Sequence, residues 1–118
     1  MDYERSTLYL NSIGQRLKVL DMPVYYELPK PDVLEPFIVI GTYNTNNDFT
    51  AKNNALIEHL SLQVDVYLPA TSRTKAEEIR SKAVKALKIR KQVTTQLLKD
   101  NSIGRETYHI VLRSREII

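Results

Sequence analysis

The sequence predicts a two-layer α+β domain, in which a mainly antiparallel sheet has two helices packed on one face. The first observation is a regular alternation of apolar and polar residues from position 59 to 68, the period of a strand with two different faces. The second is a pair of segments, at 2–20 and from about 74 to 90, whose apolar residues recur at helical spacing. The third is the order along the chain: a helix, two or three strands, a second helix, then one or two strands.

Length and composition limit the class of protein. The chain has 118 residues, enough for one domain, residues 1–118, with a core of its own. It has no cysteine, which excludes a disulfide scaffold and a thiolate metal site. No apolar stretch approaches the roughly 20 residues that cross a bilayer, and no signal peptide is expected. The net charge of +3 is mild, and the basic block of a dedicated nucleic-acid-binding protein is missing.

The first helix is predicted over residues 2–20. Apolar residues on one stripe support it, at spacings of four, four and three: Tyr9, Ile13, Leu17 and Leu20. Gly14 weakens this helix by about 1 kcal/mol relative to alanine, or else marks a close approach to the sheet. The prolines at positions 23, 29, 31 and 36 then exclude a helix. A short edge strand at 24–28 and an extended connection are expected there.

Residues 37–43 are apolar and β-branched, which predicts a buried strand. The amide-rich run 44–54 is predicted to be a long loop between two antiparallel strands. Phe49 is the single phenylalanine of this run. It either packs back onto the domain or anchors a contact with another subunit. The central strand, 59–68, follows and ends before Pro69.

The second helix is predicted to run to about Arg90. Thr74 and Glu77 have the spacing of a capping box, with Ser72 as an alternative N-cap. Alanine-rich apolar positions form one face, so that this helix lies close to the sheet: Ala76, Ile79, Ala83, Ala86 and Leu87. Three lysines represent the basic remainder of its surface, which is either solvated or binds an anionic partner: Lys75, Lys82 and Lys85. A short strand at 93–98 and a last strand from Thr107 to about Glu116 complete the sheet.

No residue is predicted to be catalytic, to bind a cofactor or to ligate a metal, and we do not expect an enzyme. His59 and His109 are the only histidines, and neither has a second ligand at the spacing of a metal motif. Asp65 would share the wetter face of the sheet with both histidines and could form an acid/base pair with either. No nucleophile motif accompanies that pair.

The chain resembles the small tail-terminator (tail-completion, head-tail joining) proteins of long-tailed bacteriophages. Residues 24–29, Val-Tyr-Tyr-Glu-Leu-Pro, follow an opening helix and lead to Pro-Phe-Ile-Val-Ile at 36–40. Leu-Ser-Leu-Gln-Val-Asp-Val-Tyr at 60–67 is similar to a strand of that family. A helix beginning Lys-Ala-Glu-Glu-Ile-Arg at residue 75 follows it directly. The order and spacing of these pieces over most of the chain constitute the likeness.

The resemblance implies a structural virion protein that forms a ring, expected to be a hexamer, on the end of the tail tube. There it would stop tail elongation and give the head a docking surface, with the major tail tube protein and a head connector as partners and no membrane or cofactor. It would occupy the head-tail junction of the virion and the host cytoplasm during assembly. A ring needs two different contact patches on each subunit. We place one in the polar run, at Asn46, Asn47, Asp48, Phe49 and Lys52.

Two other functions fit the sequence. One is another phage neck component, a head-completion or adaptor protein. The second is a small basic module that binds nucleic acid; its strands lack the usual pair of base-stacking aromatic residues, although Tyr67 and Tyr108 could serve. In the ring, Lys75, Lys82 and Lys85 would face acidic neighbours or make a transient contact with DNA.

Overall fold

The fold is built on one five-stranded sheet whose central strand is the one with the regular alternation. The computed structural model describes residues 5–49, 56–89 and 92–117. Its elements are α1 (Arg5–Arg16), the 3₁₀-helix η1 (Leu17–Leu20), β1 (Val24–Tyr25), β2 (Phe37–Phe49), β3 (Leu56–Pro69), α2 (Arg73–Leu87), β4 (Thr94–Asp100) and β5 (Thr107–Ile117). The strand order is β1-β2-β3-β5-β4, and the pairing is antiparallel except between β1 and β2. The predicted α+β fold is therefore confirmed.

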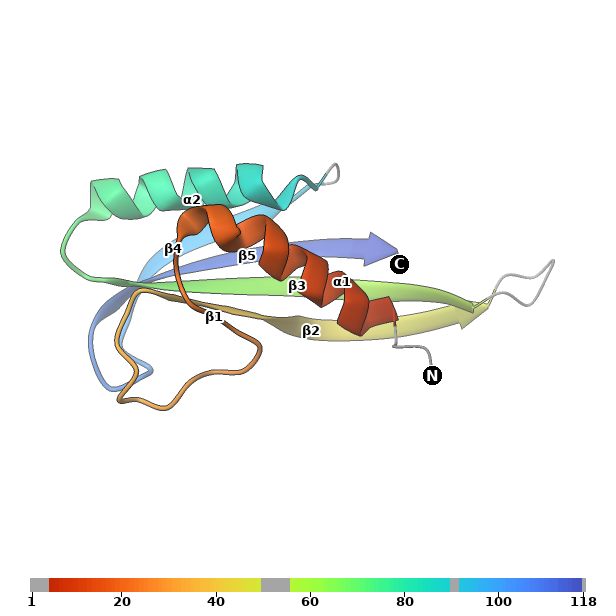
Figure 1. Cartoon of the computed structure of the whole chain (residues 1–118), viewed down its shortest axis with the longest axis horizontal. Helices are drawn as coiled ribbons and strands as arrows, with labels where there is room; N and C mark the ends of the chain where they lie inside the picture. The colour runs from red at the N-terminus through yellow and green to blue at the C-terminus, as the bar shows by residue number, and fades with distance from the viewer. Residues whose placement is uncertain (1–4, 50–55, 90–91, 118) are drawn as a thin grey trace.

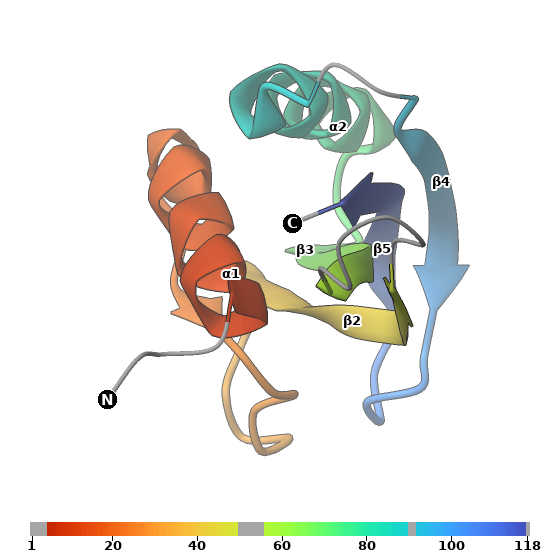
Figure 2. The ribbon, with the colours of Figure 1, turned by 90° about the vertical axis from the view of Figure 1, so that its right-hand side faces the viewer.

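Both helices lie on the same face of the sheet (Figure 1). Seen along the strands, α1 and α2 sit side by side above the concave face of the strongly twisted sheet (Figure 2). The alternating residues of β3 point at them and are buried: Leu60, Leu62, Val64, Val66 and Leu68. Their neighbours extend this apolar layer across the sheet, since Val64 pairs with Ile40 of β2 and with Leu112 of β5.

Each helix contributes a narrow apolar stripe to this core. Ile13 and Leu17 are fully buried, as the predicted stripe requires, while Tyr9 and Leu20 are only partly buried. From α2, Ala76, Ala83 and Leu87 are buried, and the two alanines let the helix lie close to the strands. The two helices are also joined directly. Arg16 Nη1 of α1 donates to the Leu87 carbonyl, 2.7 Å away, at the C-terminal end of α2, where a cation is favoured by the helix dipole.

The ends of α2 differ from the prediction. Ser72, the alternative, is the N-cap: its backbone is extended and its hydroxyl accepts a hydrogen bond from the Lys75 amide at 3.2 Å. Thr74 lies inside the first turn, and Glu77 pairs with Arg80 at 2.7 Å instead of closing a capping box. The helix ends at Leu87, before Arg90, because Lys88 takes a left-handed conformation that closes the last turn.

Gly14 is a site of close approach rather than a simple weak point. It is buried in α1, and a β-carbon there would collide with the Tyr26 hydroxyl and touch the side chain of Ile40. Gly14 therefore marks a close approach, but its tight neighbour is the side chain of Tyr26, which follows β1, and it meets the sheet only at the ordinary contact distance of Ile40.

The polar run predicted as a loop is largely strand, and that prediction is wrong for residues 44–49. β2 continues to Phe49 and pairs with β3 back to Leu56, with an irregularity between Thr42 and Asn44. The composition of these residues is typical of a loop, but their pairing with β3 specifies a strand. The two strands form an arm that extends beyond α1, α2 and the end of β5 (Figure 1). Residues 50–54 of the predicted loop lie outside the described part of the chain.

The proline-rich connection is held by one arginine from the turn between β4 and β5. β1 covers only Val24–Tyr25, shorter than predicted, and the extended segment after it lies against Arg105. The guanidinium of Arg105 binds the Glu35 carboxylate at 2.5 Å and the carbonyl oxygens of Pro31 and Val33 at 2.6 Å each. A planar fork with several donors suits such a three-way contact. The peptide bond between Glu35 and Pro36 is cis.

The N-cap assignment gives a direct test of this fold. Replacing Ser72 with alanine should lower the free energy of unfolding by about 1 kcal/mol, because the Lys75 amide loses its acceptor. The matched change Thr74→Ala should leave stability within about 0.5 kcal/mol of the parent, since Thr74 makes no capping bond. Urea denaturation of both variants measures the difference. Equal losses at both positions, or a larger loss at Thr74, would contradict the cap seen here.

Candidate functional site

The most organised group of polar side chains lies on the sheet face opposite the helices. There, rings from three neighbouring strands form a stack. The Phe37 and Tyr67 ring centroids are 5.0 Å apart, and those of Tyr67 and His109 are 4.3 Å apart with nearly parallel planes. The row follows from the register, because Phe37 pairs with Tyr67 and Tyr67 with His109. Tyr25 adds an edge-on contact to Phe37 at 6.0 Å. The side chains on this face of the sheet therefore pack against one another, instead of being fully solvated.

His109 lies between two carboxylates. Its Nε2 is 2.7 Å from Asp65 Oδ1, and its Nδ1 is 2.8 Å from Asp100 Oδ2. The three side chains are each between 12% and 18% exposed, so their polar groups have little contact with solvent. Asp65 comes from β3, His109 from β5 and Asp100 from the end of β4. Gln63 Nε2 also donates to both oxygens of Asp65, at 3.2 and 3.0 Å.

This geometry favours the charged form of the imidazole. A neutral ring has a single N–H, so it could donate to only one of the two carboxylates, whereas the imidazolium donates to both. Burial acts to lower the pKa of His109, but the hydrogen bonds and charges of Asp65 and Asp100 outweigh it and raise the pKa above 6.5. The pKa of Asp100 is lowered, first by the backbone amide of Ser102 and then by its contact with His109. Burial beside these carboxylates also raises the pKa of Tyr67 to about 12.

In this arrangement the cluster Asp65–His109–Asp100 ties three strands together. Both ring nitrogens of His109 already have a partner, so neither is open to a substrate proton or a metal ion. Within the described ranges, no group of three or more His, Cys, Asp or Glu side chains is arranged so that it could hold a metal ion. We therefore interpret the cluster as a buried ion network that joins β3, β5 and β4.

The sequence anticipated half of this cluster. It indicated that Asp65 and His109 would share a face, and the structure brings them into contact. It missed Asp100, because only the pairing of β4 with β5 brings that residue to His109. Asp100 also stabilises the turn after β4, since its Oδ1 accepts from the Ser102 amide at 2.7 Å. His59 belongs to β3 and pairs with Asn46 and Ile117, and its side chain lies outside the described part.

Tyr67 and Tyr108 do not form a base-stacking pair. Tyr67 pairs with His109, and Tyr108 pairs with the next residue of β3, Leu68. The two tyrosines therefore lie on opposite faces of the sheet. Tyr67 is 7% exposed and stacks between Phe37 and His109. Tyr108 is 8% exposed and belongs to the core beneath the helices. The proposed stacking surface is therefore not present at these two tyrosines.

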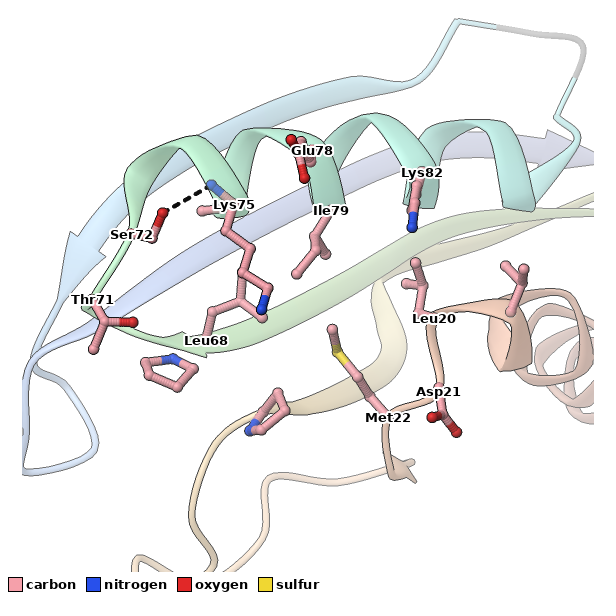
Figure 3. A pocket seen from close by; sticks show the side chains of 14 residues that line it. Leu20, Asp21, Met22, Leu68, Thr71, Ser72, Lys75, Glu78, Ile79 and Lys82 are labelled. Atoms are coloured by element: carbon pink, nitrogen blue, oxygen red, sulfur yellow. Dashed lines mark hydrogen bonds between the residues drawn. The ribbon is translucent and has the colours of Figure 1, made fainter.

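Two of the predicted basic residues line a groove between η1 and α2 (Figure 3). The groove has a volume of about 450 Å³. Its apolar walls come from both sides: Leu20 and Met22 after α1, Leu68 from β3, and Ala76 and Ile79 from α2. Lys75 and Lys82 extend over it from α2, and Asp21 and Glu78 also belong to its lining. Lys85 is exposed elsewhere on the same helix.

The residues predicted as a subunit contact are placed in the arm. Asn46, Asn47, Asp48 and Phe49 are the last residues of β2, and their register partners run from His59 back to Leu56. Lys52 lies outside the described residues. The structure thus puts four of the five at the far end of a paired strand instead of in a loop.

Comparison with known proteins assigns no family, since no protein-family model matches the chain and no curated protein sequence matches it. Neither α1 nor α2, the α-helices of the described chain, is long and apolar enough to span a bilayer.

The ion network predicts a characteristic dependence of stability on pH. Because folding raises the pKa of His109, its contribution should be complete below about pH 6.5 and should disappear as pH rises through the folded-state pKa. Because folding lowers the pKa of Asp100, its contribution should be present above about pH 3.8 and disappear on acidification. Denaturant unfolding should therefore show stability falling as the pH rises above about 6.5.

The variant His109→Gln should lose that decline above about pH 6.5, because glutamine does not titrate. His59→Gln changes the other histidine and should keep it. An unchanged pH profile in His109→Gln would show that the cluster does not carry the effect.

Proposed function

We propose that the chain is a structural virion protein that forms a ring on the end of a phage tail tube, as the resemblance implies. The observation that supports this most is the shape of the sheet. The sheet has two open edges, and the arm formed by β2 and β3 projects well past the helices (Figure 1). A subunit of a ring needs two different contact surfaces on opposite sides. The two unlike open edges of this sheet supply such surfaces.

The elongated outline fits the same role. The chain measures 54 × 27 × 23 Å along its principal axes, and the arm contributes to the longest of them. The arm projects past the helices that cover the core (Figure 1). In a ring, such arms reach a neighbouring subunit or the opening of the tube. Asn46, Asn47, Asp48 and Phe49 lie at that end.

The ion network supports a scaffold more than a reaction centre. Its groups come from three strands, are mostly buried and are already paired. Such networks fix the positions of strands but leave no reactive group free. In this proposal the protein stops tube elongation, contacts the tube protein and offers a surface to the head connector. Its place is the head-tail junction, after assembly in the host cytoplasm.

Two alternatives stay beside this proposal. A head-completion or adaptor protein of the phage neck would use similar surfaces, so the shape of the monomer does not separate the two roles. For a nucleic-acid-binding module, Tyr67 and Tyr108 are both buried and so do not replace the missing pair of base-stacking aromatic residues. The lysines of α2 then act as a charged surface toward an acidic neighbour or passing DNA.

Native mass spectrometry across a wide range of protein concentration tests the ring. We expect one closed oligomer, a hexamer by the resemblance, and negative-stain images of rings with a central opening. A monomer at every concentration, or an open series of oligomers without a preferred size, would count against it. A closed ring that fails to bind the ends of purified tail tubes would favour the adaptor reading instead.

The basic surface of α2 can be tested in the same assay. The double change Lys82→Glu and Lys85→Glu should weaken binding of the ring to its acidic partner and leave the fold intact, because both side chains are exposed. Each single change is also compared with Lys30→Glu, which reverses the charge of one exposed lysine in the proline-rich connection. Equal binding by the double variant and the parent would remove this surface from the proposal.

A further inference from the structure

The outer edge of β2 loses its neighbour partway along the strand. β1 pairs only Val24 with Ile38 and Tyr25 with Val39. From Gly41 to Phe49, no strand among the described residues lies on that side, although β3 pairs with the other side as far as Phe49. An edge of this kind presents backbone N–H and C=O groups in strand geometry, ready for another strand.

The sequence of this edge has few of the features that normally protect one. Proteins discourage pairing at open edges with proline, lysine, inward-pointing charges or very short strands. Residues 41–49, Gly-Thr-Tyr-Asn-Thr-Asn-Asn-Asp-Phe, contain no proline or basic residue, and Asp48 is the only charge. A bulge between Thr42 and Asn44 interrupts the ladder once, and from Asn44 to Phe49 the pairing with β3 is regular. The distal edge of β2 is therefore suited to accept a strand.

The chain also carries a second, unlike edge. β4 ends the sheet on the opposite side from β1 and β2, and it pairs only with β5 (Figure 2). Thr94 and Gln96 of β4 are exposed. Residues 94–98, Thr-Thr-Gln-Leu-Leu, contain neither proline nor charge. The one lysine of this strand, Lys99, stands near its end and contacts Glu106 at 3.3 Å.

The directions of these strands decide how copies can join. The pairs β2–β3, β3–β5 and β5–β4 are all antiparallel, so β2 and β4 run in opposite directions within one chain. Copies related by a rotation about an axis tilted from the strands, as in a closed sheet, keep nearly the same direction of neighbouring strands. The β4 edge of one copy then meets the β2 edge of the next as an antiparallel pair, continuous with the sheet on either side.

We propose that the distal edge of β2, Gly41–Phe49, pairs with the β4 edge of a second copy of this chain, head to tail. This inference deepens the proposed ring by naming its subunit contact, and it rests on that proposal only for the closure of the ring. The occupant is a second copy because the chain itself provides both unpaired edges with matching direction. Each junction provides hydrogen-bond partners for the backbone groups of both edges. It leaves one β2 edge and one β4 edge free to join further subunits.

The register requires successive copies to be displaced along the strands. Thr94 pairs with Arg113, Arg113 with Gln63, and Gln63 with Gly41, so β4 begins level with Gly41. From this level β4 runs toward Pro69, while the free part of β2 runs toward the end of the arm. Pairing the two edges therefore shifts each copy relative to its neighbour. Such a stagger accompanies the strand tilt of any sheet that closes on itself.

Cysteine cross-linking tests the junction without interference, because the chain has no native cysteine. Asn44 or Asn46 is changed to cysteine in the same chain as Gln96→Cys, which gives two double variants whose β2 positions differ by one two-residue strand repeat. At a concentration where the protein self-associates, mild oxidation of at least one double variant should give a series of disulfide-linked multimers, which reducing agent reverses. The single variants are the controls and should stay unlinked. Circular dichroism checks that each variant folds.

Two results would overturn the junction. Efficient dimers from Asn44→Cys or Asn46→Cys alone would show β2 edges meeting each other about a two-fold axis. An oligomer in which neither double variant forms links, and in which amide hydrogen exchange of 41–49 and 94–98 is no slower than in the dilute monomer, would show that these edges stay open. Slower exchange in both segments on association is the expected result.

The same measurements separate the two proposals. A closed ring without links or protection at these edges rejects the edge pairing and leaves the ring in place. Links and protection in an open or dimeric assembly support the edge pairing and reject the ring.

Discussion

The fold depends on the two-sided register of β3. This strand is paired with β2 on one side and β5 on the other, so it fixes the position of both neighbours at once. Its apolar residues supply the middle of the core, and burying one such side chain stabilises the fold by about 1.5–3 kcal/mol. A slip by one residue would turn Leu62 and Val64 out of the core and carry Gln63 and Asp65 beneath the helices. The alternation therefore selects one register, and the helices then have one face to cover.

The opposite face is held by polar contacts that the same register creates. Asp65, Tyr67 and His109 meet because each lies on the outward side of its strand, and Asp100 joins them from the last strand. Replacing one member would leave the others buried without their partner, which costs more than the pair contributes while intact. Arg105 acts similarly at the edge of this face, where it ties the proline-rich connection to the turn before β5. The ion network and the Arg105 contacts both hold loops and strands that the apolar core does not contact.

The arm and the two open edges are what remain after the core and the polar face are accounted for. β2 extends past the helices that cover the core, and its backbone there is paired with β3 as far as Phe49. A ladder with one free side is also the simplest surface for adding another strand. A structural role in a ring and an edge-to-edge contact both use this property, and neither requires a reactive group.

The sequence by itself determined the α+β class, the central strand, the apolar stripe of α1 and the alanine-rich face of α2, because these depend on local periodicity. It also placed Asp65 and His109 on one face. It could not determine that residues 44–49 continue a strand, since their polarity matches a loop and only pairing with β3 specifies their conformation. Nor could it find Asp100 beside His109, the Ser72 cap in preference to Thr74, or the reason for Gly14. Each of these depends on which distant segment lies nearby or which of two adjacent caps the backbone selects, and only the tertiary structure decides that.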